Sequence, residues 1–167
     1  RLWYHNRAMS SSIFHEYDIR GRYTGEVNEA VFYNLGIAIA QAFRPKKIAV
    51  ARDNRLSSDT LFLYLTAGLA SQKVKITDLG QSTTPFCLWY SQKYKIDALT
   101  ITASHNPKDQ NGLKIFLAKS GAIDKDSGLL KVKARFDNLS FNLNPMDTKS
   151  AASFFIKGDL EKTILEY

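Results

Sequence analysis

The sequence predicts an α/β fold, a three-layer α-β-α sandwich with a mostly parallel mixed sheet. Short apolar segments of strand length alternate along the chain with longer segments of helical periodicity. This order favours parallel strands that are joined by helices. The chain has 167 residues, of which 44% are hydrophobic, and this is enough for one good core.

The predicted helices carry recognisable start or stop signals. Residues 29–43 have apolar side chains near helical spacing, and Arg44-Pro45 ends the segment. Ser57 or Ser58 caps a second helix that runs to about residue 71. A third begins near Pro85 behind a cap at Thr83 or Thr84, and its Phe86, Leu88, Trp89 and Tyr90 are expected in the core.

The predicted strands are apolar or β-branched segments between these helices. They comprise residues 47–51, 74–79, 96–102 and, as an antiparallel addition, 113–117. In the last strand, alternation places Lys114 on the face opposite Leu113 and Ile115, so that Lys114 can point toward the loop that precedes it. No internal repeat is evident.

That preceding loop, Thr102-Ala103-Ser104-His105-Asn106-Pro107, is the most informative part of the chain. Ser104 directly follows a strand that is expected to be buried. Pro107 restricts the backbone, and Asn111-Gly112 is expected to form a turn. The loop should therefore be rigid. From the residue types alone, a polar turn in which Ser104 and Asn106 merely satisfy backbone groups is an equally good interpretation.

Ligands of open α/β sheets bind beyond the carboxyl ends of the strands. Ser104 lies at one such end, and Arg52-Asp53 follows another. For Asp18, Asp53 and Arg55, loop caps and an internal ion pair are better explanations than direct chemistry.

The hexapeptide resembles the active-site serine loop of the α-D-phosphohexomutases, the family that contains phosphomannomutases and phosphoglucomutases. Three further stretches are similar in order and spacing: Ile13–Gly21, Ala51–Ser58 and Asn111–Lys114. Ala51 departs from the usual glycine. Tyr17-Asp18-Ile19-Arg20 and Thr102-Ala103 look more like the bacterial phosphomannomutase and phosphoglucomutase branch than the glucosamine branch.

The resemblance implies a phosphoserine mechanism. Phosphorylated Ser104 would phosphorylate a hexose monophosphate, mannose and/or glucose, and the resulting hexose 1,6-bisphosphate, also the activator, would return its other phosphate. Ser104, His105 and Lys114 are the expected catalytic residues, and Tyr17, Arg20 and Lys114 are expected to bind substrate. Mg²⁺ would be held through an oxygen of the Ser104 phosphate. The residue types leave open that His105 is a loop histidine bonded to backbone.

The resemblance also implies further domains, because phosphohexomutases have four. The chain contains no Asp-Gly-Asp-x-Asp segment, which supplies the metal-binding carboxylates in the family. We expect residues 1–12 to be a tag or N-terminal remnant, 13–157 to form the first domain, and 158–167 to begin the connection to a second. The remaining domains of the same polypeptide and a phosphosugar are the expected partners, and the isolated chain should have negligible turnover.

Charge and cysteine content limit the alternatives. The net charge of +7 comes from scattered lysines and arginines, which favours a solvated basic surface over a nucleic-acid partner. No segment is long enough to cross a membrane, and Cys87 is the only cysteine, which suggests a cytoplasmic protein without an intrachain disulfide.

Two rival functions remain. A serine hydrolase using Ser104 is disfavoured because Gly-x-Ser-x-Gly is absent and the adjacent His105 is poorly placed as its base. The second rival is a non-catalytic α/β domain that binds phosphosugars or polyanions.

Overall fold

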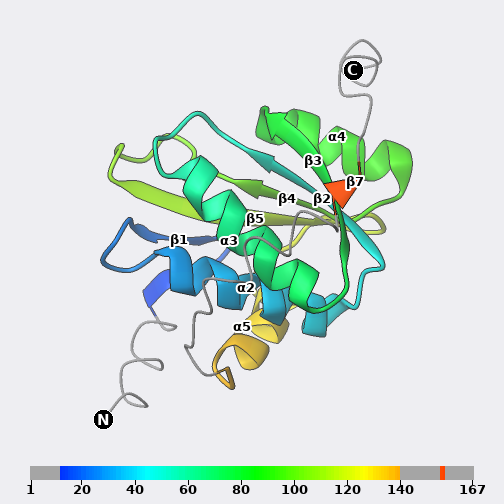
Figure 1. Cartoon of the computed structure of the whole chain (residues 1–167), viewed down its shortest axis with the longest axis horizontal. Helices are drawn as coiled ribbons and strands as arrows, with labels where there is room; N and C mark the ends of the chain where they lie inside the picture. The colour runs from blue at the N-terminus through cyan, green and yellow to red at the C-terminus, as the bar shows by residue number, and fades with distance from the viewer. Residues whose placement is uncertain (1–11, 140–154, 157–167) are drawn as a thin grey trace.

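A mixed sheet of seven strands organises the part of the chain that the computed structural model describes, residues 12–139 and 155–156 (Figure 1). The strands are β1 (Ile19–Arg22), β2 (Lys47–Arg52), β3 (Lys75–Gln81), β4 (Ala98–Ile101), β5 (Gln110–Leu117), β6 (Gly121–Ala122) and β7 (Phe155–Ile156). Their order is β1-β5-β4-β2-β3-β7, and β6 pairs with β5. The pairs β4-β2, β2-β3 and β3-β7 are parallel, whereas β5 pairs antiparallel with β1, β4 and β6.

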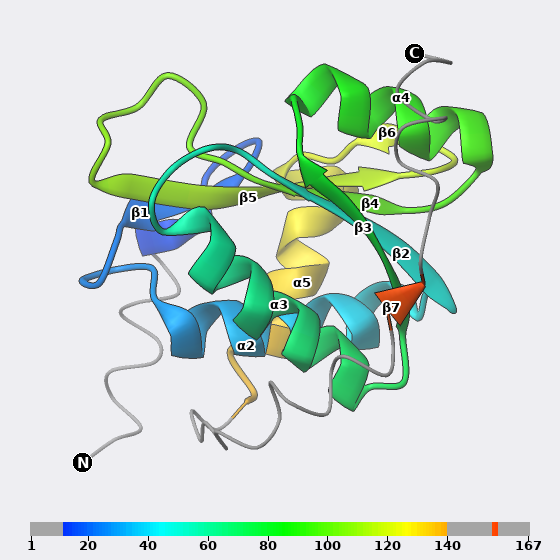
Figure 2. The same ribbon diagram turned by 45° about the horizontal axis from the view of Figure 1, so that its top comes forward.

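Helices cover both faces of this sheet and complete the three expected layers. The helical segments are α2 (Glu29–Phe43), α3 (Ser58–Ser71), α4 (Thr84–Tyr94), the π-helical turn η1 (Lys125–Leu129) and α5 (Leu130–Phe136). Figures 1 and 2 show α2, α3 and α5 on one face and α4 on the other. Two separate apolar cores result, a large one beneath α2, α3 and α5 and a smaller one beneath α4.

The α/β sandwich and the elements with strong periodicity are confirmed. Helix α2 has the predicted bounds, and Thr83 caps α4 by accepting a hydrogen bond from the backbone N–H of Phe86. Ser57 precedes α3 but makes no side-chain capping hydrogen bond. Of the four side chains expected in the core, Phe86 and Tyr90 are buried in the smaller core, whereas Leu88 and Trp89 are only partly buried against it.

The turn predicted at Asn111-Gly112 is wrong, because both residues lie inside β5. Gly112 pairs with Arg20 of β1, a strand that the sequence analysis did not anticipate. A Cβ atom on Gly112 would overlap the carbonyl oxygen of Ile19, so close approach of β1 accounts for this glycine. The segments expected at residues 1–12 and 158–167 lie outside the described residues, except for Ser12.

Two glycines allow α2 and α3 to pack closely. A Cβ atom on Gly68 of α3 would overlap the carbonyl oxygen of Tyr33, and one on Gly36 of α2 would overlap that of Leu65. Backbone atoms of a packed helix cannot move aside as a flexible side chain can. The spacing of these two helices therefore depends on the absence of side chains at the crossing.

We predict that Gly68→Ala destabilises the protein by about 1–2 kcal/mol, because an overpacking cost of about 2–3 kcal/mol exceeds the roughly 1 kcal/mol that alanine gains over glycine in helix propensity. Urea denaturation followed by circular dichroism would measure the change. Gly25→Ala is the matched control, since a Cβ atom there meets nothing within 4 Å. Equal stability of the two variants would contradict the close packing.

Cys87 is fully buried in the smaller core beneath α4. Its thiol donates a hydrogen bond of 3.3 Å to the carbonyl oxygen of Leu99. Burial raises the pKa of Cys87 from 9.0 to about 12, so the thiol is neutral at physiological pH. This neutral thiol contributes fully to stability below pH 9.0, and the contribution is lost as the pH rises toward about 12.

We predict that Cys87 reacts with a chromogenic disulfide reagent at about pH 8 at least about 100-fold more slowly in the folded protein than in denaturant. Absorbance of the released thiolate gives both rates, and Cys87→Ser should remove the signal. Rapid labelling of the folded protein would contradict the burial.

Candidate active site

Parallel pairing of β2 with β4 brings two loops to the same edge of the sheet. Arg52 pairs with Ile101, and the backbone N–H of Asp53 then donates to the carbonyl oxygen of Ile101 at 2.9 Å. The segments that follow the two strands line an open pocket. Its wall includes Asp53, Asn54, Arg55, Leu56, Ser57, Gln81, Ser82, Thr83, Thr84, Thr100, Thr102, Ser104, Asn106, Lys108, Asp109 and Tyr23.

Ser104 is exposed and lines this pocket in an unusual backbone conformation. Its φ angle is +56°, in the left-handed region that costs an L-residue about 1–2 kcal/mol. The hydroxyl of Thr102 compensates locally, since it accepts a hydrogen bond of 2.9 Å from the backbone N–H of Ser104. The loop thus holds Ser104 in a conformation that serine rarely adopts.

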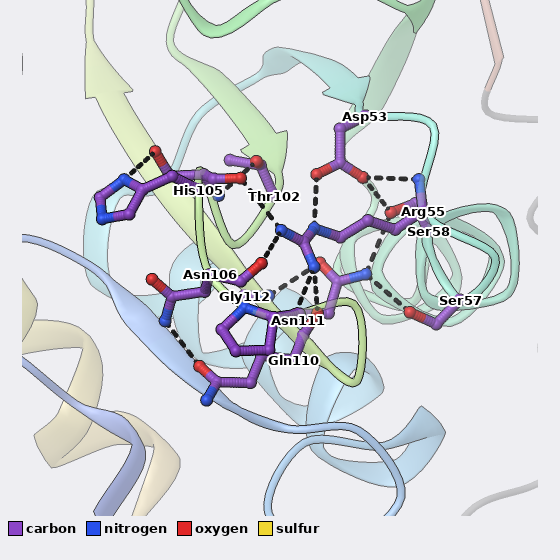
Figure 3. A network of polar contacts seen from close by, with 12 residues as sticks. Asp53, Arg55, Ser57, Ser58, Thr102, His105, Asn106, Gln110, Asn111 and Gly112 are labelled. Atoms are coloured by element: carbon purple, nitrogen blue, oxygen red, sulfur yellow. Dashed lines mark hydrogen bonds and ion pairs between the residues drawn. The ribbon is translucent and has the colours of Figure 1, made fainter.

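Hydrogen bonds within the loop tie its two arms together (Figure 3). The backbone N–H of Asn106 donates to Ala103 at 3.1 Å, and that of Gln110 donates to Pro107 at 3.0 Å. The side-chain amide of Asn106 also donates to Oε1 of Gln110 at 2.6 Å. These contacts restrain the loop in the way that the sequence analysis expected of a rigid one.

A buried asparagine connects the loop to helix α3. Asn111 is fully buried at the start of β5, and its amide nitrogen donates to the hydroxyls of Ser57 at 2.8 Å and Ser58 at 3.0 Å. Its amide oxygen accepts from the backbone N–H of Gly112. Ser58 in turn donates to Oδ1 of Asp53 at 2.6 Å, which links the network to the end of β2.

Two cations and one carboxylate lie on the β1 side of the loop. Nζ of Lys114 is 3.0 Å from Oδ2 of Asp18, and Nε of Arg20 is 3.9 Å from the other oxygen of this carboxylate. Nη1 of Arg20 donates to Oδ1 of Asn106 at 3.1 Å and so contacts the serine loop directly. The group carries a net charge of +1, which suits an anionic ligand.

Tyr23 borders the pocket and remains a neutral phenol. Its hydroxyl donates to Oε1 of Glu29 at 2.7 Å. Burial, followed by this hydrogen bond, raises the pKa of Tyr23 to about 12. Tyr23 therefore cannot act as a base near neutral pH.

The remaining two predicted site residues are exposed. Nδ1 of His105 is 3.4 Å from the hydroxyl oxygen of Ser104, longer than a usual hydrogen bond. Among the described residues, the side-chain hydrogen-bond partner of His105 is Ser104 and not a carboxylate, so the third member of a hydrolase triad is missing there. Tyr17 is 68% exposed, and it is not part of the pocket wall.

The described residues do not by themselves fit a metal ion. No group of three or more histidine, cysteine, aspartate or glutamate side chains within residues 12–139 and 155–156 could hold one. No helix in these ranges combines the length and apolar character needed to cross a bilayer.

Residues 11–143 match the family model described as phosphoglucomutase/phosphomannomutase, alpha/beta/alpha domain I. The chain belongs to this family. It is 37% identical to a phosphomannomutase of Escherichia coli over 121 residues, which cover 72% of this chain and 27% of that protein. It is 32% identical to a protein of Xanthomonas campestris named phosphohexose mutases over 126 residues, 75% of this chain and 28% of that one.

The solved structures agree with this assignment. A crystal structure of a phosphoglucomutase/phosphomannomutase family protein from Burkholderia thailandensis superposes with a TM-score of 0.67 and 30% identity. The superposition covers 77% of this chain and 30% of that one. The chain therefore spans between a quarter and a third of the length of these family members.

The sequence analysis missed several residues that shape the serine loop of this family member. Thr102 was recognised only as part of the loop, and Asn111 was assigned to a turn. Arg55 was expected in an internal ion pair, and its Nε does lie 3.2 Å from Oδ2 of Asp53. No sequence signal indicates its contacts with loop carbonyl groups 49 to 55 positions away.

We predict that Asn111→Ala destabilises the protein by about 3 kcal/mol, since it leaves a buried N–H group without its partner and removes two further hydrogen bonds. Urea denaturation would measure the loss. Asn138→Ala is the control, because exposed Asn138 makes a similar bond at the surface, to the carbonyl oxygen of Ala134. Similar small losses in both variants would contradict the role of the buried network.

Proposed function

We propose that this chain is the serine-bearing domain of a phosphohexomutase that interconverts hexose 1-phosphate and hexose 6-phosphate, with mannose and/or glucose as the sugar. The observation that carries the proposal is the placement of Ser104. It lines the pocket on a loop that is held by several hydrogen bonds, in a domain of this family. Phosphoryl transfer requires positioning and charge neutralisation more than covalent help, and a rigid loop beside two cations offers both.

The proposed reaction takes place in two transfers. In the first, the bond from phosphorus to Oγ of phosphorylated Ser104 breaks, a bond from phosphorus to a sugar hydroxyl oxygen forms, and the hydroxyl proton leaves to a base. In the second, the opposite phosphate of the hexose 1,6-bisphosphate moves to Oγ of Ser104 and the freed sugar oxygen takes up a proton. The net result is the same sugar with its phosphate at the other position.

The cations beside the loop have distinct proposed roles. Arg20 is tethered to Asn106 and is placed to bind a phosphate by a charge-assisted hydrogen bond. Lys114, held by Asp18, adds positive charge that stabilises the transferring phosphoryl group or relays a proton. Exposed His105 and Tyr17 would orient the substrate from the solvent side.

The proposed Mg²⁺ would contact the Ser104 phosphate, and its carboxylate ligands would have to come from outside the described residues. Discrimination between one hexose and another is likewise assigned to the parts of the polypeptide beyond this chain. We therefore propose that this chain alone has negligible turnover.

The test uses the full-length protein that contains this chain, with mannose 1-phosphate and glucose 1-phosphate as substrates and with Mg²⁺ and a bisphosphate primer. We predict that Ser104→Ala lowers the turnover of both sugars by at least about 1,000-fold, because the phosphoryl acceptor is lost. Coupled spectrophotometric detection of the hexose 6-phosphate measures the rate.

Ser120→Ala is the matched control, since Ser120 is an exposed turn residue outside the pocket wall. It should retain wild-type turnover. A folded wild-type protein that converts neither sugar, or a Ser104→Ala variant with full turnover, would overturn the proposed function.

A further inference from the structure

Arg55 has an unusual set of contacts among the described residues. It lies between β2 and α3, its side chain is only 13% exposed, and Figure 3 shows it beside the serine loop. Nε donates to Oδ2 of Asp53 at 3.2 Å. The two terminal nitrogens donate to four loop carbonyl oxygens: Nη1 to Pro107 (2.7 Å) and Gln110 (3.0 Å), Nη2 to Ser104 (3.0 Å) and Asn106 (2.7 Å).

These contacts use every donor that a guanidinium group possesses, since arginine has five N–H bonds on its side chain. Arg55 therefore has no N–H group left to donate to a phosphate. Arg20 differs, because its guanidinium donates one hydrogen bond within the part of the chain that the structure describes. Whatever Arg55 contributes must act through the backbone of the loop.

The four carbonyl groups need this cation in order to converge. Their negative ends point at one region, where they would repel one another without a positive group between them. One of them belongs to Ser104, whose left-handed backbone is held at its N–H by Thr102 and at its carbonyl oxygen by Arg55. Arg55 and Thr102 thus act on opposite sides of the same strained residue.

Asp53 fixes the guanidinium in turn. Its Oδ1 accepts from the backbone N–H of Arg55 at 3.1 Å and from the hydroxyl of Ser58 at 2.6 Å, while Oδ2 accepts from Nε. The carboxylate therefore orients Arg55 from within its own turn. The same turn is attached to β4 through the hydrogen bond from the N–H of Asp53 to Ile101.

We propose that Arg55 is a positioning residue, which fixes the conformation of Ser104 by gathering four backbone carbonyl groups of the serine loop around one guanidinium. It does not contact the substrate. The catalytic consequence rests on the proposed function, in which Ser104 carries the phosphoryl group, whereas the structural consequence for the loop does not.

Lysine cannot replace this arrangement. A lysine retains the positive charge, but its ammonium group has three donors on a single nitrogen and no planar fork to reach four separate carbonyl oxygens. Arg55→Lys therefore separates the effect of charge from that of geometry. A small displacement of Ser104 is enough to slow phosphoryl transfer.

The experiment compares Arg55→Lys, Arg55→Ala and the control Arg135→Lys in the full-length protein. Arg135 is exposed on α5, outside the pocket wall. We expect Arg55→Lys to lower kcat by about 100-fold and to change KM by less than about threefold. Hydrogen exchange of the backbone amides of residues 104–106 and 108–110 should become at least about tenfold faster, with no change in α2.

Chemical rescue adds a readout that a general loss of stability would not produce. Ethylguanidinium at low millimolar concentration should restore part of the turnover of Arg55→Ala, whereas ethylammonium should not. Arg135→Lys should behave as the wild type in both turnover and exchange. Exchange in α2 (Glu29–Phe43) reports whether each variant is folded.

The inference would be overturned if Arg55→Lys had the kcat of the wild type and if its loop amides exchanged hydrogen at the wild-type rate. It would also be overturned by a loss of activity in Arg55→Ala that follows the folded fraction and is not rescued by ethylguanidinium. If the wild type itself fails to convert hexose phosphates, the proposed function is overturned instead. Hydrogen exchange of the loop amides then decides whether Arg55 positions the loop. Faster exchange in Arg55→Lys than in Arg135→Lys supports this role, and equal exchange overturns it.

Discussion

The geometry of the candidate site depends on the parallel pairing of β2 with β4. Because these strands run in the same direction, the segments that leave them emerge at one edge of the sheet, and Asp53 lies directly beside Ile101. This neighbourhood lets a turn near residue 55 support a loop near residue 104. Had the two strands been separated by another strand, Arg55 could not reach the serine loop.

Two kinds of polar residue surround the loop, and they differ in how far their hydrogen-bonding capacity is used. Asn111 is fully buried and Arg55 nearly so, and both are engaged with neighbouring groups of the protein. The charged groups of Arg20 and Lys114 make polar contacts only with Asn106 and Asp18 among the described residues, and these two side chains are about a quarter exposed. The first kind suits the support of the loop, whereas the second suits an anionic ligand.

The sequence predicted what depends on local periodicity and failed where distant segments meet. Helix α2 and the cap of α4 follow from nearby residues, and both were correct. Asn111-Gly112 has the composition of a turn, but pairing with β1 makes it part of a strand. The left-handed backbone of Ser104 also escaped prediction, because it depends on Thr102 together with Arg55, which is 49 positions away.

A loop that is fixed by its own domain changes how binding energy can be used. The entropy cost of ordering residues 102–110 is met when the domain folds, so a substrate does not have to order them when it binds. Substrate contacts can then be reserved for the transition state, which raises kcat more than it lowers KM. Loosening the loop would not remove a substrate contact, but it would spread Ser104 over many orientations of which few can react. An effect on kcat with little change in KM is therefore the kinetic signature of a residue that acts through the backbone of the loop.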